Sequence, residues 1–174
     1  SPPINEKSLP SPISPYGSSK LCGEAYCSSF SSAYKMNIIA LRFSNIIGPY
    51  SYHKNGIIQK YFSSIKSNDG FIVYGDGTAS RDYLHVIDVC RAISLIIEKN
   101  INNYNLFHLS SGKETTINQI IALVTKVCNL ENPLIKYLPD RPGEIYRTFA
   151  NNNLAKTAFG FQPTLSLFKA IEDA

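Results

Sequence analysis

Short apolar runs alternate with amphipathic segments along most of the chain, and this alternation constrains the fold more than any other feature. The run "NIIALRF" (37–43) is rich in isoleucine and is typical of a buried strand. The segment "IIQKYFSSIK" (57–66) instead places its apolar residues at helical spacing. Strands that alternate with helices predict an α/β fold.

The same two patterns continue to the end of the chain. We expect further strands in "FIVYG", "RDYLHV", "NLFHLS" and "LIKYL" (71–75, 81–86, 105–110 and 134–138). We expect further helices over 17–36, 86–99, 117–130, 151–160 and 166–174. Thr116 and Gln119 form a capping box at the start of one of them. The proline-rich start, residues 1–15, and the Gly-Pro segment 44–56 are predicted loops.

Length and charge limit the class of protein. The chain has 174 residues, 44% of them hydrophobic, which is enough for a substantial core in about one domain. A net charge of +4 without an arginine-rich block favours an anionic small molecule over nucleic acid. No apolar run reaches about 18 residues and no charged-then-apolar leader occurs, so we expect a cytoplasmic protein without a membrane span. Because the chain starts at Ser1 and its only methionine is Met36, we expect a piece of a larger protein.

The cysteines and histidines do not have the spacing of a metal site. The four cysteines form no C-x-x-C pair, and the three histidines lie far apart in sequence. We therefore expect no bound metal, and we expect the cysteines to be reduced and to act as small core residues.

Tyr16 and Lys20 in "SPYGSSK" have the spacing of an acid/base and its activating cation. Residues i and i+4 share a helix face, and a nearby ammonium lowers the pKa of a phenol from about 10. The alternative is an ordinary exposed pair, and Tyr50 and Lys54 repeat the spacing in "YSYHK". The flanking residues distinguish the two pairs: Tyr16 follows Pro15 at the start of a predicted helix, whereas Tyr50 lies between helix-breaking residues.

Five motifs in order carry a family resemblance: "SPYGSSKLCGE", "ALRFSNIIGP", "VYGDGTASRDYLHVIDV", "DRPGEIYRTFAN" and "FGFQP". The chain resembles the extended short-chain dehydrogenase/reductases, and within them the nucleotide-sugar epimerases and dehydratases, with the UDP-glucose 4-epimerases most similar. The glycine-rich turn and the catalytic Ser or Thr of that family would lie upstream and are absent. The resemblance therefore implies the C-terminal half of such an enzyme, inactive by itself.

The resemblance also implies an architecture. The chain would form the C-terminal part of a doubly wound NAD(P)-binding Rossmann-type fold and the smaller α/β substrate-binding domain. Residues 1–55 would belong to the first, and 56–174 mainly to the second, with short segments returning to the Rossmann sheet. NAD would be the cofactor, and the helix over 17–36 would form a homodimer through its outer face.

Three residues would serve the chemistry and the cofactor. Tyr16 would be the acid/base, and Lys20 would hold the nicotinamide ribose while lowering the pKa of the tyrosine. Ser44 would contact the nicotinamide end of the cofactor through its backbone.

The remaining predicted site residues would bind a UDP-sugar. Asn45, Arg81 and Arg141 would bind the diphosphate, for which guanidinium is well suited. Val73 and Tyr74 would pack around the uracil. The alternative for Asn45 is an ordinary turn residue, and the alternative for Arg81 is an ion pair with Asp82. Arg141 could instead be a solvated loop arginine, and Val73 and Tyr74 could simply belong to a core strand. Gly56 stands where these epimerases often have an asparagine, so that contact with the sugar nucleotide is missing.

The activity implied is epimerisation of a nucleotide sugar at C4 through a transient 4-keto sugar. Within enzymes the alternative is a nucleotide-sugar 4,6-dehydratase or a related sugar-nucleotide enzyme. From another class, the alternative is a non-catalytic module that binds NAD(P) or a sugar nucleotide. The sequence does not distinguish NAD from NADP, because the ribose-reading acidic residue would lie upstream.

Overall fold

The computed structural model describes residues 2–141, 143 and 145–174. The helices are α1 (Pro15–Tyr34), α2 (Ile57–Ser67), α3 (Val86–Lys99), α4 (Ile117–Val127), α5 (Asn153–Phe159) and α6 (Leu167–Glu172). The strands are β1 (Ile38–Phe43), β2 (Asn45–Ile47), β3 (Phe71–Tyr74), β4 (Ser80–Arg81), β5 (Tyr83–His85), β6 (Tyr104–Leu109), β7 (Thr115–Thr116), β8 (Ile135–Leu138) and β9 (Arg147–Thr148). This is the mixed α/β class that the sequence predicts.

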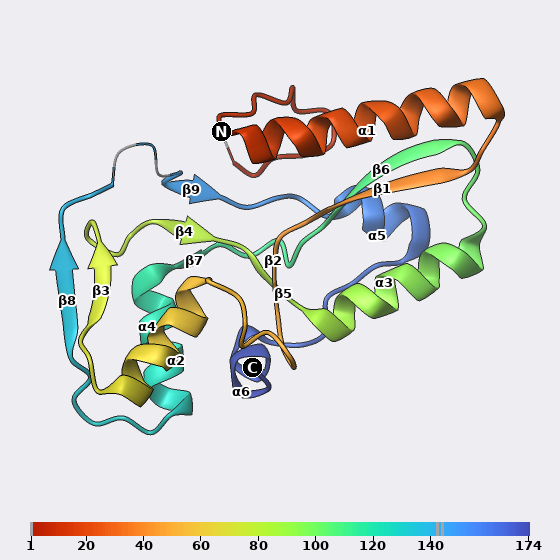
Figure 1. Ribbon diagram of the computed structural model, residues 1–174. Helices are drawn as coiled ribbons and strands as arrows, with labels where there is room; N and C mark the ends of the chain where they lie inside the picture. The colour runs from red at the N-terminus through yellow and green to blue at the C-terminus, as the bar shows by residue number, and fades with distance from the viewer. Residues whose placement is uncertain (1, 142, 144) are drawn as a thin grey trace.

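One layered unit surrounds the parallel pair β1–β6. Helix α1 covers one face of the pair, and α3 and α5 lie on the other (Figure 1). Alternate residues of β6, Phe107 and Leu109, are buried against α3 and α5, where Phe107 meets Phe159 edge-on at 5.1 Å between ring centroids. The intervening His108 pairs in register with Arg42 of β1 and faces the α1 side.

A second core lies around the parallel pair β3–β8, which packs with α2, α4 and α6. Tyr61 of α2 is its largest fully buried side chain, 4.5 Å from Phe71 between ring centroids. The Tyr61 hydroxyl is satisfied by a hydrogen bond of 2.8 Å to Thr125 of α4. In Figure 1 strands β3 and β8 and helices α2 and α4 lie at the lower left, away from α1 at the top.

Short strands join the two cores. β2 pairs in parallel with β5, and β4 lies between β7 and β9. Chain segments 45–47 and 83–85 therefore run together through the middle of the molecule (Figure 1).

The expected strand 81–86 is wrong as one element. It divides at Asp82, so that β4 and β5 belong to different sheets. The cause is the buried Asp82, whose carboxylate accepts backbone N–H bonds of 2.9 Å from Ser111 and from Gly112. A side chain anchored in this way turns the backbone between two short strands.

Other boundaries differ for local reasons. The helix expected over 17–36 begins at Pro15, because Ser14 caps it by accepting a bond of 3.1 Å from Gly17 N, and it ends where Lys35 turns left-handed at φ 56°. The expected loop 44–56 contains strand β2, and the last helix ends at Glu172. The capping box of Thr116 and Gln119 is confirmed.

The four cysteines are free thiols, but the expectation that they are core residues is wrong. Cys22 and Cys90 are exposed, and Cys27 and Cys128 are only partly buried. Over the described residues, no helix is both long and apolar enough to cross a bilayer. The same residues contain no group of three or more His, Cys, Asp or Glu placed to hold a metal ion.

Candidate active site

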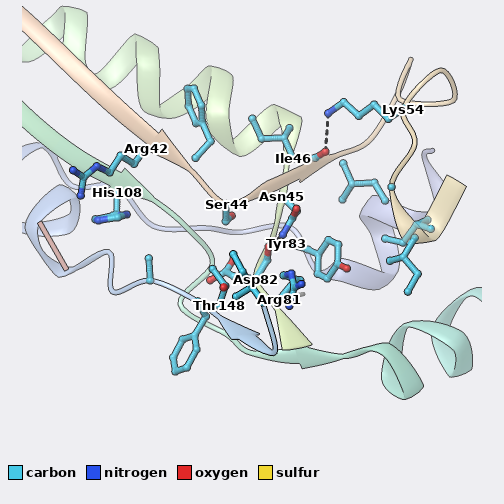
Figure 2. A pocket seen from close by; sticks show the side chains of 18 of the residues that line it. Arg42, Ser44, Asn45, Ile46, Lys54, Arg81, Asp82, Tyr83, His108 and Thr148 are labelled. Atoms are coloured by element: carbon cyan, nitrogen blue, oxygen red, sulfur yellow. Dashed lines mark hydrogen bonds between the residues drawn. The ribbon is translucent and has the colours of Figure 1, made fainter. Parts of the chain in front are cut away.

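A cavity of about 730 Å³ opens between the two cores, where β1 leads into β2 and β4 into β5 (Figure 2). Tyr16, Ser44, Asn45 and Arg81 all line it. These residues come from α1, the β1–β2 junction and β4, so the fold brings together positions that are far apart in the sequence.

A second cavity, of about 470 Å³, continues toward β3. Val73, Tyr74 and Arg141 line it, and Asn45 and Arg81 line both cavities. The predicted cofactor and substrate residues thus fall into two adjoining spaces. Lys20 lies outside both sets of described lining residues, beside Tyr16 on α1.

Tyr16 and Lys20 lie on the first two turns of α1. The Lys20 ammonium nitrogen is 5.1 Å from the centroid of the Tyr16 ring, and the ring is 72% exposed. The expectation that Tyr50 and Lys54 are not held on a helix is confirmed: Tyr50 has φ 65° in a turn, and Lys54 Nζ donates to Ile46 O at 2.9 Å (Figure 2). Equal spacing therefore gives two different geometries.

Two buried polar atoms without a partner among the described residues both belong to the first cavity: Ser44 Oγ and His108 Nε2. A buried polar atom left unpaired costs about 1–3 kcal/mol, so such an atom points to a ligand or water. Burial lowers the pKa of His108 below its ordinary value, which favours the neutral ring. Ser44 and His108 thus line the cavity, while these two polar atoms are themselves buried.

Asn45 lines both cavities and is hydrogen-bonded to Asp82, which lines the first. Asn45 N and Asn45 Nδ2 both donate to Asp82 O at 2.9 Å. The Asn45 side chain therefore has the structural role of a turn asparagine, while its Oδ1 and the second Nδ2 hydrogen remain available to a ligand. Burial raises the pKa of the Asp82 carboxyl, and the N–H bonds from Ser111 and Gly112 oppose that rise.

Arg81 does not form the alternative ion pair with Asp82, whose carboxylate is turned to the Ser111–Gly112 backbone. One guanidinium nitrogen of Arg81, Nη1, donates to Ser80 O at 2.7 Å, so Nε and Nη2 can still donate to a ligand. Next to it, Arg147 makes bonds of 2.5 and 2.7 Å to Glu114, which also accepts from Ser80 Oγ. These bonds lower the pKa of Glu114 to about 2 and hold β9 against β4.

At the far end of the second cavity, Arg141 lies over the Tyr74 ring, with its guanidinium carbon 3.5 Å from the ring centroid. This is a close cation–π contact. Val73 is 1% exposed and belongs to the core around β3, although it also lines the cavity. Pro142 and Glu144 of the "DRPGE" motif lie outside the described residues.

Among the lining residues that sequence reasoning missed are Lys54 and His108 in the first cavity, Lys60 in the second, and Tyr83 in both. Lys60 follows Ile57 by three positions on α2, so both side chains share the face turned to the cavity. Burial raises the pKa of Tyr83 to about 12, so this phenol stays protonated. In the sequence these residues look like ordinary surface lysines and strand residues, and only the fold places them together.

The second cavity is strongly cationic. Lys60, Arg81 and Arg141 line it, and no carboxylate belongs to its described lining residues. Such a wall favours an anionic ligand.

Three of the known proteins that are similar to this chain illustrate the range of its relatives. The chain is similar to the dTDP-glucose 4,6-dehydratase of Streptomyces niveus, with 27% identity over 93% of this chain and 48% of the length of that protein. A UDP-glucose 4-epimerase from Thermotoga maritima, solved with UDP-glucose, superposes with a TM-score of 0.87 at 30% identity, over 98% of this chain and 55% of that chain. The UDP-glucuronic acid 4-epimerase of Bacillus cereus, solved with UDP-glucuronic acid and NAD, gives a TM-score of 0.89 at 27% identity, over 99% and 55%.

The chain therefore spans about half the length of the relatives it matches. Its match to a family model covers residues 1–108, which include α1, both halves of the β1–β2 junction and β6 almost to its end. On this evidence, the chain belongs to the NAD dependent epimerase/dehydratase family.

Proposed function

We propose that the full-length protein is an NAD-dependent nucleotide-sugar 4-epimerase of the UDP-glucose/UDP-galactose type. The observation that carries this proposal is the adjacency of two cavities that share Asn45 and Arg81 as lining residues. Tyr16 lines one of these cavities, and cations line the other. A nucleotide sugar has the matching order of parts, with a neutral sugar at one end and a charged diphosphate in the middle.

The substrate would lie along both cavities. Arg81 and Asn45, at the shared wall, would donate to the diphosphate, and Arg141 would donate from the other side. The uracil would lie near Val73 and Tyr74, against the face of the tyrosine ring that Arg141 leaves uncovered. This places the sugar in the first cavity, on the side of Tyr16.

The residues around Ser44 fit the nicotinamide end of NAD. Ser44 lines the first cavity at the β1–β2 junction, and Lys20 lies one turn beyond Tyr16 on the same helix. Lys20 would hold the nicotinamide ribose, and Ser44 would contact the carboxamide. When bound, NAD supplies a hydride acceptor that can return the hydride.

Tyr16 would move the proton. As the phenolate, Tyr16 would take the proton from the C4 hydroxyl of the sugar as the 4-keto sugar forms. After the sugar turns over in the cavity, the Tyr16 hydroxyl would return the proton to the O4 oxygen on the other face. The exposure of Tyr16 leaves its hydroxyl free to reach a ligand.

We also propose the division of the chain stated from the sequence: residues 1–55 in the NAD-binding domain, and 56–174 mainly in the nucleotide-sugar domain. The core around β1 and β6 includes α3 and α5, which supports segments of 56–174 returning to the Rossmann-type sheet. The chain alone would be inactive, because the family's glycine-rich turn is absent from it. A cytoplasmic homodimer completes the proposal.

A second candidate is a nucleotide-sugar 4,6-dehydratase, which the similarity to the Streptomyces niveus enzyme favours. The two reactions differ in product: an epimerase interconverts isomers, whereas a dehydratase releases water and leaves a 4-keto-6-deoxy sugar. Incubation of the full-length protein with UDP-glucose and with dTDP-glucose, followed by mass spectrometry of the products, separates them.

Substitution of Tyr16 by Phe tests the catalytic proposal. Because Tyr16→Phe keeps the ring but removes the proton carrier, we expect kcat to fall by about 100- to 10,000-fold with UDP binding unchanged. Tyr50→Phe is the matched control and should leave kcat unchanged. Arg81→Ala should instead weaken UDP binding more than it lowers kcat. Steady-state epimerisation of UDP-glucose and UDP-galactose, with calorimetric UDP binding, provides the measurements. Equal losses for Tyr16→Phe and Tyr50→Phe, or no loss in either, would show that Tyr16 is not the acid/base.

A further inference from the structure

A two-pronged ion pair connects α1 to the strand that leads into the candidate site. Arg42 Nε donates to Glu24 Oε1 at 2.7 Å, and Arg42 Nη2 donates to Glu24 Oε2 at 2.7 Å. Both side chains are largely removed from solvent, with exposed fractions of 24% for Arg42 and 19% for Glu24. A bidentate pair of this kind fixes orientation as well as distance.

The ion pair connects two parts of the candidate site, helix α1 and the end of strand β1. Glu24 follows Lys20 by four residues and Tyr16 by eight, so the three side chains lie along one face of α1. Arg42 precedes Phe43, the last residue of β1, and Ser44 follows directly. The ion pair therefore sets the height and rotation of the Tyr16–Lys20 face over the end of β1.

Apart from this ion pair, α1 makes few buried polar contacts with the rest of the described chain. Its only fully buried described residue is Ser31, near the far end, where Ser31 Oγ donates to Met36 O. In Figure 2, Arg42 lies beside His108 at one end of the cavity, away from Asn45 and Arg81. Both side-chain hydrogen bonds of Arg42 among the described residues go to Glu24.

We propose that Glu24 and Arg42 are positioning residues that hold the Tyr16 hydroxyl in register with the site formed at Ser44 and Asn45. This inference rests on the proposed function of Tyr16. Arg42 lines the first cavity but commits two donors to Glu24, so its contribution comes through the helix. Displacement of a reacting group by about 1 Å can cost about 100-fold in rate.

A double-mutant cycle in the full-length protein tests this role. Glu24→Gln and Arg42→Gln should each lower kcat by about 10- to 100-fold while UDP affinity stays within about twofold, because the cationic cavity is untouched. The double variant should be no slower than the slower single variant, since both remove one interaction. Hydrogen–deuterium exchange should show faster exchange in the first half of α1 in all three variants.

Glu172→Gln provides the control, because it removes an exposed bond of 3.0 Å to Lys169 on α6, and kcat should not change. If a single variant fails to fold, the exchanged pair Glu24→Arg/Arg42→Glu should fold and recover at least part of kcat. Unchanged kcat in the folded single variants would overturn the proposal, as would additive losses in the double variant. Loss of UDP or NAD affinity in Arg42→Gln alone would assign Arg42 to direct ligand contact instead. If the unmodified protein epimerises nothing, the proposed function fails, while unchanged exchange in α1 would independently reject the positioning role.

Discussion

The stacking of Arg141 on Tyr74 allows a quantitative prediction about UDP binding. The guanidinium carbon lies 3.5 Å from the ring centroid, so the aromatic ring holds the arginine in place before a ligand arrives. A cation–π contact at a partly exposed site is worth about 0.5–1 kcal/mol, which corresponds to about two- to fivefold in affinity. A charge-assisted hydrogen bond from Arg141 to the diphosphate is worth about 1.5–3 kcal/mol, or about 10- to 150-fold.

Three substitutions in the full-length protein separate these contributions. Arg141→Ala should weaken UDP binding by about 10- to 150-fold, since it removes the charged donor. Tyr74→Leu should weaken binding by at least two- to fivefold, since the arginine loses its platform. Tyr74→Phe keeps the ring and serves as the matched control, with affinity unchanged.

The decisive measurement is the cost of Tyr74→Leu in two backgrounds, by calorimetry with UDP at fixed ionic strength. We expect this cost to be about two- to fivefold smaller when Arg141 is already Ala, because the platform then has nothing to hold. Any remaining cost should appear equally with uridine, as a contact between the ring and the base. Equal costs in both backgrounds would refute the coupling and leave Tyr74 acting on the base alone.

Two further predictions concern charge and assembly. Lys60→Gln should weaken UDP binding by about two- to fivefold and reduce the salt dependence of that binding, while uridine binding is unchanged. Lys66 lies on the same helix but outside the cavity lining, so Lys66→Gln should change neither the affinity for UDP nor its salt dependence. Equal effects of the two substitutions would contradict a local role for Lys60. The aromatic residues Tyr26, Phe30 and Tyr34 are exposed on the outer face of α1. We therefore expect the full-length protein to sediment as a dimer at micromolar concentration, and we expect Phe30→Asp to shift it to monomer. A monomeric unmodified protein would rule out this interface.

The elements with a complete pattern of their own were predictable from the sequence. Helix α3 has strong amphipathic spacing and was placed at its observed bounds, and α4 carries its own start signal in the Thr116–Gln119 box. Tyr16 and Lys20 were expected at the start of a helix because Tyr16 follows Pro15, and α1 begins at Pro15, two residues before the expected start. In these cases, the local sequence contains the information that decides the structure.

What could not be predicted depends on partners distant in the chain. β7 and β9 have two residues each, too few for any periodicity, and exist because each pairs with β4. Lys60 has the composition and helical position of a solvated lysine, and only the approach of β3 and the Arg141 segment makes it a cavity residue. Local patterns do not carry such long-range information.

Asp82 explains why the site depends on this kind of long-range contact. Its carboxylate is buried although burial raises its pKa, which means that desolvation opposes the charged form there. The same residue ends β4 directly after Arg81, and its carbonyl accepts from Asn45 N and Asn45 Nδ2. Through one residue the fold therefore directs Asn45 and Arg81, two of the three predicted diphosphate-binding residues, into the wall shared by both cavities. The "SRDYLHV" motif reads as a plain strand in the sequence, yet its interruption at Asp82 is what builds the candidate substrate site.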